Sequence, residues 1–281
     1  MGKLAYTWKL MGASWDVLKK DKELLVFPLI SGICCLLVLA SFAIPIVLSG
    51  GLQTAEGEGA AAPQVMYYGL LFLFYLANYF VIIFFNSAII SCAIIRMQGG
   101  DPTVGDGLRM ASARLPQILG WALLSATVGL VLRIIEDKSE WVGKLVAGLL
   151  GMAWTIVSYL AVPVLVVEKK GPIEALKESA GMLKRTWGQQ LVGNFGFGLI
   201  FFLLAIPGII LIVIGGTMAA GASAVLGGAV LVLGIIYFII LGLVQSALQT
   251  IFQAALYLYA RSEEVPPGFD EAMLSGAIRQ K

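Results

Sequence analysis

Three glutamines recur at helical spacing near the end of the chain, inside a long apolar region. Gln245, Gln249 and Gln253 are four residues apart, so all three lie on one face of a helix. Amides are poorly suited to face lipid and pair instead with polar groups on other helices. The three glutamines therefore predict either a polar lining for a cavity or conduit, or hydrogen bonds that fix the helices to one another. The candidate members of the same polar intramembrane face on other helices are Asn78, Asn86 and Asn194.

The residue types that support catalysis and metal binding are scarce in this chain. There is no histidine, which removes histidine-based nucleophile activation, metal ligation and proton relays. The cysteines have neither the spacing of a metal site nor that of a disulfide framework, so we expect them to be packing residues. No phosphate-binding glycine loop and no pair of carboxylates beside a cleft is recognisable. We therefore predict a protein that is not an enzyme and binds no cofactor and no metal. The cysteines are Cys34, Cys35 and Cys92.

Long uncharged stretches indicate that these polar residues lie in a membrane. Residues 191–260 contain no Asp, Glu, Lys or Arg, although one bilayer-spanning helix needs only about 20 apolar residues. Hydrophobic residues make up 59% of the chain and the mean hydropathy is +0.91. Because backbone in lipid must satisfy its own hydrogen bonds, we predict an all-α, polytopic bundle of six transmembrane helices. The predicted spans are 24–50, 65–95, 115–132, 145–167, 191–215 and 225–260.

The positions of the basic residues predict the orientation of the helices. Only three of the 19 Lys and Arg residues fall in the connection 133–144, and none falls in 51–64 or 216–224. The other sixteen lie in the remaining connections and the two tails. Since basic residues favour the cytoplasmic side, we expect both termini there, including a cytoplasmic tail at 261–281. No polar stretch is long enough to fold separately, so 1–281 is predicted to be a single membrane domain.

Three short amphipathic segments precede the first, third and fifth spans. In each, apolar residues recur at spacings of three and four. Each is too short to cross a membrane, as expected of helices that lie in the interface plane. The chain is therefore predicted to contain three repeats of an interfacial helix followed by a transmembrane hairpin. The simpler interpretation is that any basic loop that re-enters lipid looks amphipathic. The predicted interfacial helices are 4–20, 104–114 and 172–187.

Several of these segments resemble a known group of proteins. The stretch from Pro163 to Glu168, followed by 171–179, resembles a motif of uncharacterised prokaryotic six-helix integral membrane proteins of unknown function. These proteins resemble the membrane domain of glycerophosphodiester phosphodiesterases. The loop 99–103 and the tail around Phe269 look similar to one stand-alone branch. The resemblance implies six helices in the prokaryotic cytoplasmic (inner) membrane. It implies no catalysis, because the catalytic domains of those enzymes use His residues that this chain lacks.

These features predict a non-enzymatic integral membrane protein that organises the membrane or interacts with lipids or a partner protein. The expected partners are membrane lipids and a protein bound through the cytoplasmic amphipathic helices, and nothing in the chain suggests nucleic-acid binding. The alternative is a permease or channel for a small or lipid-like solute, in which the glutamine face lines the path. Neither the ligand nor the oligomeric state follows from the sequence.

Overall fold

A computed structural model of the protein describes residues 3–48, 61–138, 141–221, 223–262, 265–270 and 274, and the side chains of all of these except 3–6, 61–64 and 183–195. In the described residues the protein is all-helical, with 89% helix and no strands. The helices are, in chain order, α1 (Lys3–Lys20), the 3-10 turn η1 (Lys22–Leu25), α2 (Val26–Leu48), α3 (Ala61–Met97), α4 (Val104–Ser112), α5 (Leu115–Lys138), α6 (Val142–Val157), α7 (Ala161–Val167), α8 (Pro172–Ala220) and α9 (Ala224–Ser262).

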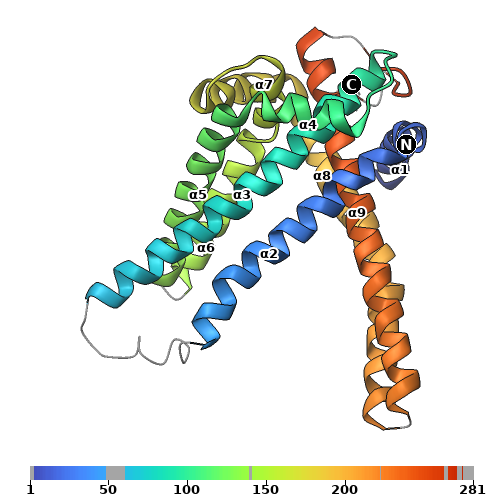
Figure 1. The fold of residues 1–281 in the computed structure, drawn as a ribbon. Helices are drawn as coiled ribbons and strands as arrows, with labels where there is room; N and C mark the ends of the chain where they lie inside the picture. Colours follow the sequence, from blue (N-terminus) through green and yellow to red (C-terminus); the bar gives the residue numbers. More distant parts are fainter. Residues whose placement is uncertain are drawn as a thin grey trace.

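Among the described residues, six helical segments are long and apolar enough to cross a membrane, which confirms the predicted number. The short helices α1, α4 and α7 gather at one end of the molecule, while the long helices extend away from it (Figure 1). The structure therefore has the length and composition of a six-helix membrane protein. The segments are Lys22–Leu48, Val65–Met97, Leu115–Lys138, Val142–Val167, Gly196–Ala220 and Ala224–Ser262.

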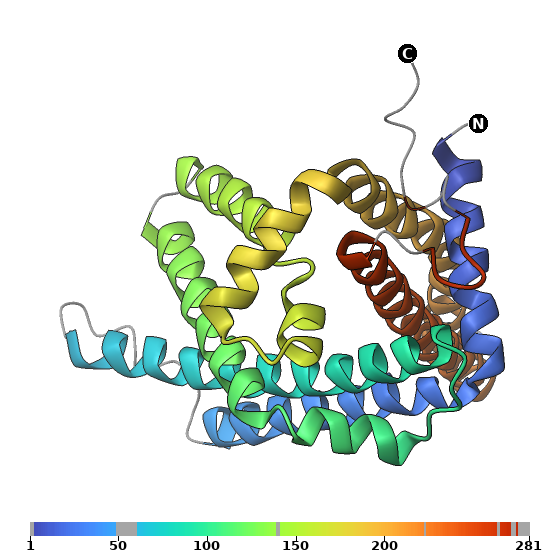
Figure 2. The same cartoon turned by 90° about the horizontal axis from the view of Figure 1, so that it is seen from above.

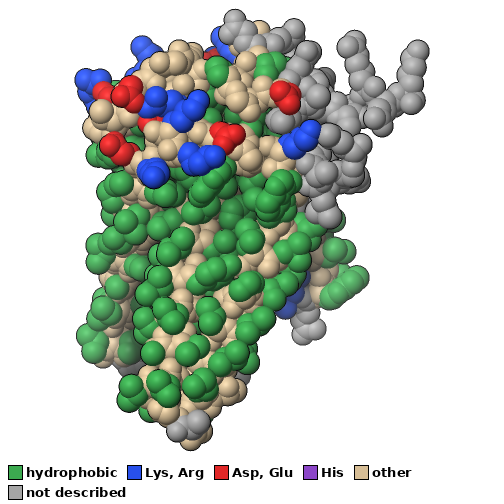
Figure 3. Space-filling view, turned by 90° about the vertical axis from the view of Figure 1, so that its right-hand side faces the viewer, with side chains coloured by type: hydrophobic (Ala, Val, Ile, Leu, Met, Phe, Trp, Pro, Cys, Tyr) green, Lys and Arg blue, Asp and Glu red, His purple; other side chains and the backbone are tan. Residues whose placement is uncertain are grey.

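Charged side chains mark one end of the molecule. Figure 3 shows Lys, Arg, Asp and Glu side chains gathered at one end, above a surface covered by hydrophobic side chains. We call this the charged end: it comprises α1, α4, the junction between α7 and α8, and the last turn of α9 (Figure 1). The hydrophobic core lies close to it, with fully buried side chains contributed by α1, α3, α7 and α9. Examples are Leu10, Ile89, Leu165 and Ile251.

The predicted span at 145–167 is two helices rather than one continuous helix. α6 ends at Val157 and α7 begins at Ala161, with a turn at 158–160 between them. Pro163 is the third residue of α7, and proline removes a helical hydrogen bond from the preceding turn. The proline therefore accounts for an interruption at this position.

The predicted interfacial helix at 172–187 and the predicted span at 191–215 form one helix, α8. Its start is capped by Glu174, whose carboxylate accepts from the Gly171 N–H at 3.3 Å. No proline follows Pro172 until Pro207, so the backbone hydrogen bonds continue through both segments. Figure 2 shows the first part of α8 (yellow) lying across the end of the molecule, before the helix turns to run beside α9. The three-repeat arrangement therefore stays a prediction.

Candidate functional site

A polar pocket opens beside the glutamine face of α9, and we call it the amide pocket. Its volume is about 270 Å³. Gln245, Gln249 and Gln253 all line it, together with Asn86 of α3. The structure thus brings together four of the six polar residues singled out from the sequence. The lining residues that sequence reasoning missed are Tyr159, Gly242, Ser246 and Thr250.

Asn78 is not among the described residues that line this pocket. Asn78 lies on α3, and its side-chain amide donates to the Phe74 carbonyl at 2.9 Å. This bond lies within one helix and joins no neighbour. The side chain of Asn194 lies outside the described residues. The described part of the polar face is therefore smaller than the sequence predicted.

The interruption between α6 and α7 forms one wall of the amide pocket. Pro163 has no N–H, so the carbonyl four residues earlier, that of Tyr159, loses its helical donor. The side-chain amide of Gln253 donates to this carbonyl instead. Gln253 therefore supplies the hydrogen bond that the Tyr159 carbonyl lacks at the interruption between α6 and α7. The signal for this contact was present in the sequence as Pro163, but the identity of its partner was not.

Ser179 of α8 satisfies the other backbone groups of the same interruption. Its hydroxyl donates to the Val157 carbonyl at 2.6 Å and accepts from the Leu160 N–H at 3.0 Å. The Ser179 side chain is buried, so these bonds replace contacts with water that the backbone groups cannot make. The turn between α6 and α7 is therefore held from two sides, by α8 and by α9.

The two remaining glutamines leave hydrogen-bonding capacity in the pocket. Gln245 and Gln249 are half-buried and make no side-chain hydrogen bond to a described residue. Each amide offers two N–H donors and a carbonyl acceptor. A polar group bound in the amide pocket would therefore meet donors and acceptors that no described side chain occupies.

An ionic cluster lies one turn beyond the amide pocket, towards the charged end. The hydroxyl of Tyr257 donates to Glu168 Oε1 at 3.0 Å, and the Glu168 side chain is only 8% exposed. Lys170 Nζ lies 2.7 Å from Glu168 Oε2 and 2.9 Å from Glu178 Oε2, and Arg261 Nε lies 3.5 Å from Glu168 Oε1. The two carboxylates raise the pKa of Lys170 above its ordinary value. These charges are paired, so the cluster ties α7, α8 and α9 together.

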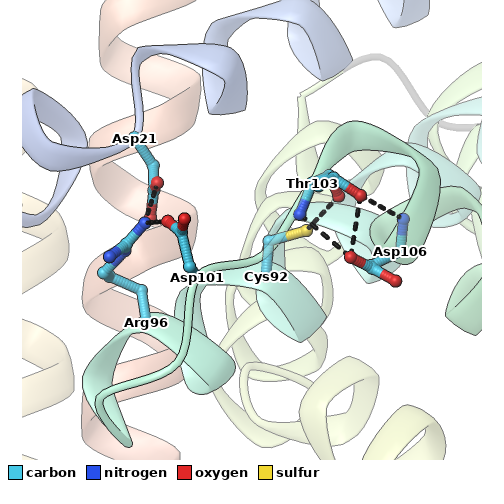
Figure 4. Close-up of polar contacts among 6 residues, drawn as sticks. All are labelled: Asp21, Cys92, Arg96, Asp101, Thr103 and Asp106. Carbon is cyan, nitrogen blue, oxygen red and sulfur yellow. Dashed lines mark hydrogen bonds and ion pairs between the residues drawn. The ribbon is translucent and has the colours of Figure 1, made fainter.

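A second ionic cluster joins α1 to α3 (Figure 4). Arg96, near the end of α3, pairs with Asp21, which follows α1, and with Asp101 in the loop before α4. The Asp21 side chain is 9% exposed, whereas that of Asp101 is 91% exposed. Because screening by water weakens exposed pairs, the bond to Asp21 is the one that holds α1 in place.

The loop that carries Asp101 continues into the capped start of α4 (Figure 4). The Thr103 N–H donates to Asp106 Oδ2 at 3.1 Å, and the Asp106 N–H donates to Thr103 Oγ1 at 3.2 Å. The hydrogen bonds from Thr103 lower the pKa of Asp106. The Cys92 thiol donates to the Thr103 carbonyl at 3.6 Å. This network is a capping box, which fixes the start of the helix.

The described part of the chain contains no cluster of side chains suited to binding a metal ion. No group of three or more His, Cys, Asp or Glu side chains there is arranged to hold a metal ion. Cys34, Cys35 and Cys92 are free thiols. The chemistry available at the predicted residues is therefore that of the amides and hydroxyls of the amide pocket.

Comparison with known proteins indicates a family but no activity. A family model described as a family of unknown function (DUF6159) matches residues 65–266. No curated protein and no solved structure matches the chain. Nothing in these comparisons supports the resemblance to glycerophosphodiester phosphodiesterases. A functional conclusion must therefore come from the geometry of the site.

Proposed function

The chain belongs to DUF6159, a family of unknown function, and we propose that it is a non-enzymatic integral membrane protein that binds the uncharged polar part of a membrane lipid. The ligand site is the amide pocket. The support is one observation: Gln245 and Gln249 present amides with no partner among the described residues to an open space of about 270 Å³. Unpaired amides next to lipid are unfavourable, so a polar ligand group stabilises this arrangement.

The length of α9 supports a position of the amide pocket at the membrane boundary. Residues 224–244 rise about 30 Å along the helix axis, which is the thickness of the hydrocarbon core. Gln245 comes immediately after this stretch, and the first charged residue of α9, Arg261, lies further on. The pocket therefore falls at the depth of the glycerol and ester groups of a lipid. These groups are uncharged and hydrogen-bonding.

The chemistry of the lining supports an uncharged ligand. The lining side chains are amides, hydroxyls and one glycine, with no Asp, Glu, Lys or Arg among them. A charged headgroup would lose water without gaining an opposite charge. A hydroxyl or ester carbonyl instead meets amide donors and acceptors of matching type. Diacylglycerol carries these groups and no charge, so we take it as the representative ligand.

A substitution that fills the amide pocket with a side chain tests whether a lipid binds there. A Cβ placed at Gly242 meets no heavy atom within 4 Å, so Gly242→Leu projects into the amide pocket without a backbone clash. Gly228 lies on the same helix, has the same open surroundings and is not part of the lining, which makes Gly228→Leu the matched control. The protein is placed in nanodiscs of phosphatidylcholine with a small fraction of diacylglycerol, and retained lipid is counted by native mass spectrometry.

The expected result is enrichment of diacylglycerol on the wild-type protein and on Gly228→Leu. Gly242→Leu should lose this enrichment by about tenfold, which corresponds to about 1.4 kcal/mol of binding free energy. Equal diacylglycerol retention by the two variants, or no enrichment on the wild type, would contradict the proposal.

A permease is the second candidate, and the interruption between α6 and α7 favours it. Broken helices line substrate sites in many transporters, and here the break contributes Tyr159 to the amide pocket. A permease predicts that liposomes containing the protein take up a small uncharged polyol such as glycerol faster than empty liposomes. The same Gly242→Leu variant should then abolish uptake. Uptake equal to that of empty liposomes would exclude the permease. It would not contradict the proposed binding of a lipid.

The proposal extends to the arrangement of the chain in the membrane. It includes three repeats of interfacial helix and hairpin, both termini in the cytoplasm of a prokaryotic inner membrane, and a protein partner bound through the amphipathic helices. The common location of α1 and α4 at the charged end supports this arrangement (Figure 1). Reporter fusions at both termini test the orientation, because signals from opposite sides of the membrane would contradict it.

A further inference from the structure

A groove of about 430 Å³ with mostly hydrophobic walls lies between α1, α8 and α9, and we call it the apolar groove. Figure 2 shows α1 (blue) running alongside α8 and α9 at this side of the molecule. The groove uses a different face of α9 from the amide pocket, at the same height along the helix. From α9 it takes Tyr237, Ile240, Leu241, Val244 and Leu248, from α8 Phe201 and Leu204, and from α1 Trp8, Met11, Gly12 and Trp15.

The walls of the groove suit hydrocarbon and offer little to a polar group. Among the described residues of the lining, only Tyr237 has a hydroxyl, and that hydroxyl donates to the Leu204 carbonyl. The remaining polar side-chain atoms of the lining are the indole nitrogens of Trp8 and Trp15. An apolar cavity of this kind excludes water. Its natural occupant is therefore an apolar chain.

The surroundings of the groove determine which apolar chain is present. The α8 and α9 residues of the lining belong to segments apolar enough to cross a membrane, so the groove opens towards lipid. Trp8 is 61% and Trp15 is 42% exposed on α1, and tryptophan favours the headgroup boundary of a bilayer. Between them, a Cβ at Gly12 would meet no heavy atom within 4 Å. The opening therefore lies where an acyl chain joins its headgroup.

The charge of the adjoining segment selects the headgroup. Lys9, Lys20 and Lys22 lie on α1 and η1, are exposed, and have no acidic partner among the described residues. Lys19 pairs with Asp16 at 2.8 Å. Exposed lysines beside a membrane attract anionic lipids.

We propose that the apolar groove binds one acyl chain of an anionic phospholipid, whose headgroup is held by Lys9, Lys20 and Lys22. The site is separate from the amide pocket and does not depend on the function proposed there. It makes α1 a lipid-binding element, with Trp8 and Trp15 on either side of the chain. A zwitterionic phospholipid with the same chains carries no net negative charge, so it gains less from the lysines and binds less tightly.

Filling the groove at Gly12 tests this site directly. Gly12→Leu adds a side chain in open space between the two tryptophans. Gly32 of α2 has equally open surroundings and lies outside the groove, so Gly32→Leu is the matched control. The full chain is placed in nanodiscs with equal amounts of phosphatidylglycerol and phosphatidylcholine of identical acyl chains, and the retained lipids are counted by native mass spectrometry.

The wild type and Gly32→Leu should retain phosphatidylglycerol in excess over phosphatidylcholine, and Gly12→Leu should lose this excess by about tenfold. A second variant leaves the groove intact: Lys9→Gln, Lys20→Gln and Lys22→Gln together should remove the preference for phosphatidylglycerol while phosphatidylcholine is still retained. Unchanged retention by Gly12→Leu, or an unchanged preference in the triple variant, would overturn the proposal. Gly242→Leu should leave phosphatidylglycerol retention unchanged, which separates this site from the amide pocket.

Discussion

The amide pocket and the apolar groove lie on two faces of the same turns of α9, yet they have opposite chemistry. Gln245 and Gln249 line one face, and Val244 and Leu248 line the other. Residues one apart on a helix differ by about 100° in direction, so neighbouring residues reach different surroundings. The difference teaches that the position of a residue around α9, rather than the composition of the helix as a whole, sets the chemistry of each site.

The two sites also differ in how their walls are held. The wall of the amide pocket is the interruption between α6 and α7, which depends on hydrogen bonds from Ser179 and Gln253. The wall of the apolar groove is α1, which is held near α3 by the ion pair of Asp21 with Arg96. Substitutions at these contacts should therefore impair one site and spare the other.

The largest expected effect is the loss of the Asp21 carboxylate. Asp21→Ala leaves Arg96 partly buried without its main partner, and should lower the free energy of unfolding by about 3 kcal/mol. We expect phosphatidylglycerol retention to fall because α1 is released, while diacylglycerol retention is preserved. Denaturant unfolding in detergent micelles and native mass spectrometry measure the two effects.

The matched control for this substitution is Asp101→Ala, because Asp101 pairs with the same arginine from an exposed position. Its effect should stay within about 1 kcal/mol. Equal destabilisation by the two substitutions would contradict the expectation that the buried pair of Arg96 with Asp21 contributes more stability than the exposed pair of Arg96 with Asp101.

The next effect concerns the wall of the amide pocket. Ser179→Ala removes the partner of the Val157 carbonyl and the Leu160 N–H, and should cost about 2 kcal/mol because the site is buried. Diacylglycerol retention should fall and phosphatidylglycerol retention should not. Ser41→Ala removes an exposed hydroxyl that donates to the Val38 carbonyl within its own helix, and it should change neither stability nor retention. A loss at both sites in Ser179→Ala would mean that the two sites are coupled.

A smaller effect separates the glutamines from one another. Gln253→Leu leaves the Tyr159 carbonyl without a donor and should lower the free energy of unfolding by about 1 kcal/mol. Gln245 has no hydrogen-bond partner among the described residues, so Gln245→Leu should leave the stability unchanged and reduce only diacylglycerol retention. Thermal unfolding with and without added diacylglycerol measures both effects. Destabilisation by Gln245→Leu would indicate a structural role for that amide.

The smallest effect is the response to pH. The folded-state pKa of Asp106 lies below its ordinary value of 3.8, so its stabilising contribution is present above that value and is lost as pH falls through the folded-state pKa. Amide hydrogen exchange at the start of α4 should therefore accelerate, relative to intrinsic rates, only in acid. Asp106→Asn should remove this dependence.

Neither binding site shares the acid response of Asp106, since neither lining contains Asp, Glu or His. Retention of both lipids should be constant from about pH 5 to 8. A change in retention within this range would show that a titrating group outside the lining controls one of the sites.

Several features were determined by the sequence alone. The uncharged stretches predicted six long apolar helices, and the structure has six. The four-residue spacing placed Gln245, Gln249 and Gln253 on one face, and all three line the same pocket. The predicted number of helices is confirmed because hydropathy is a local property of the chain, and the shared face of the glutamines follows from helical periodicity, which is equally local.

Other features were decided by the tertiary structure. Pro163 leaves the Tyr159 carbonyl without its helical donor, but only the fold brought Gln253 to that carbonyl. The spacing did not reveal that Asn86 joins the glutamines while Asn78 bonds within its own helix. Nor did it reveal a groove beneath Trp8 and Trp15. Periodicity determines which side chains share a face, whereas the partner of that face depends on contacts between segments far apart in the chain.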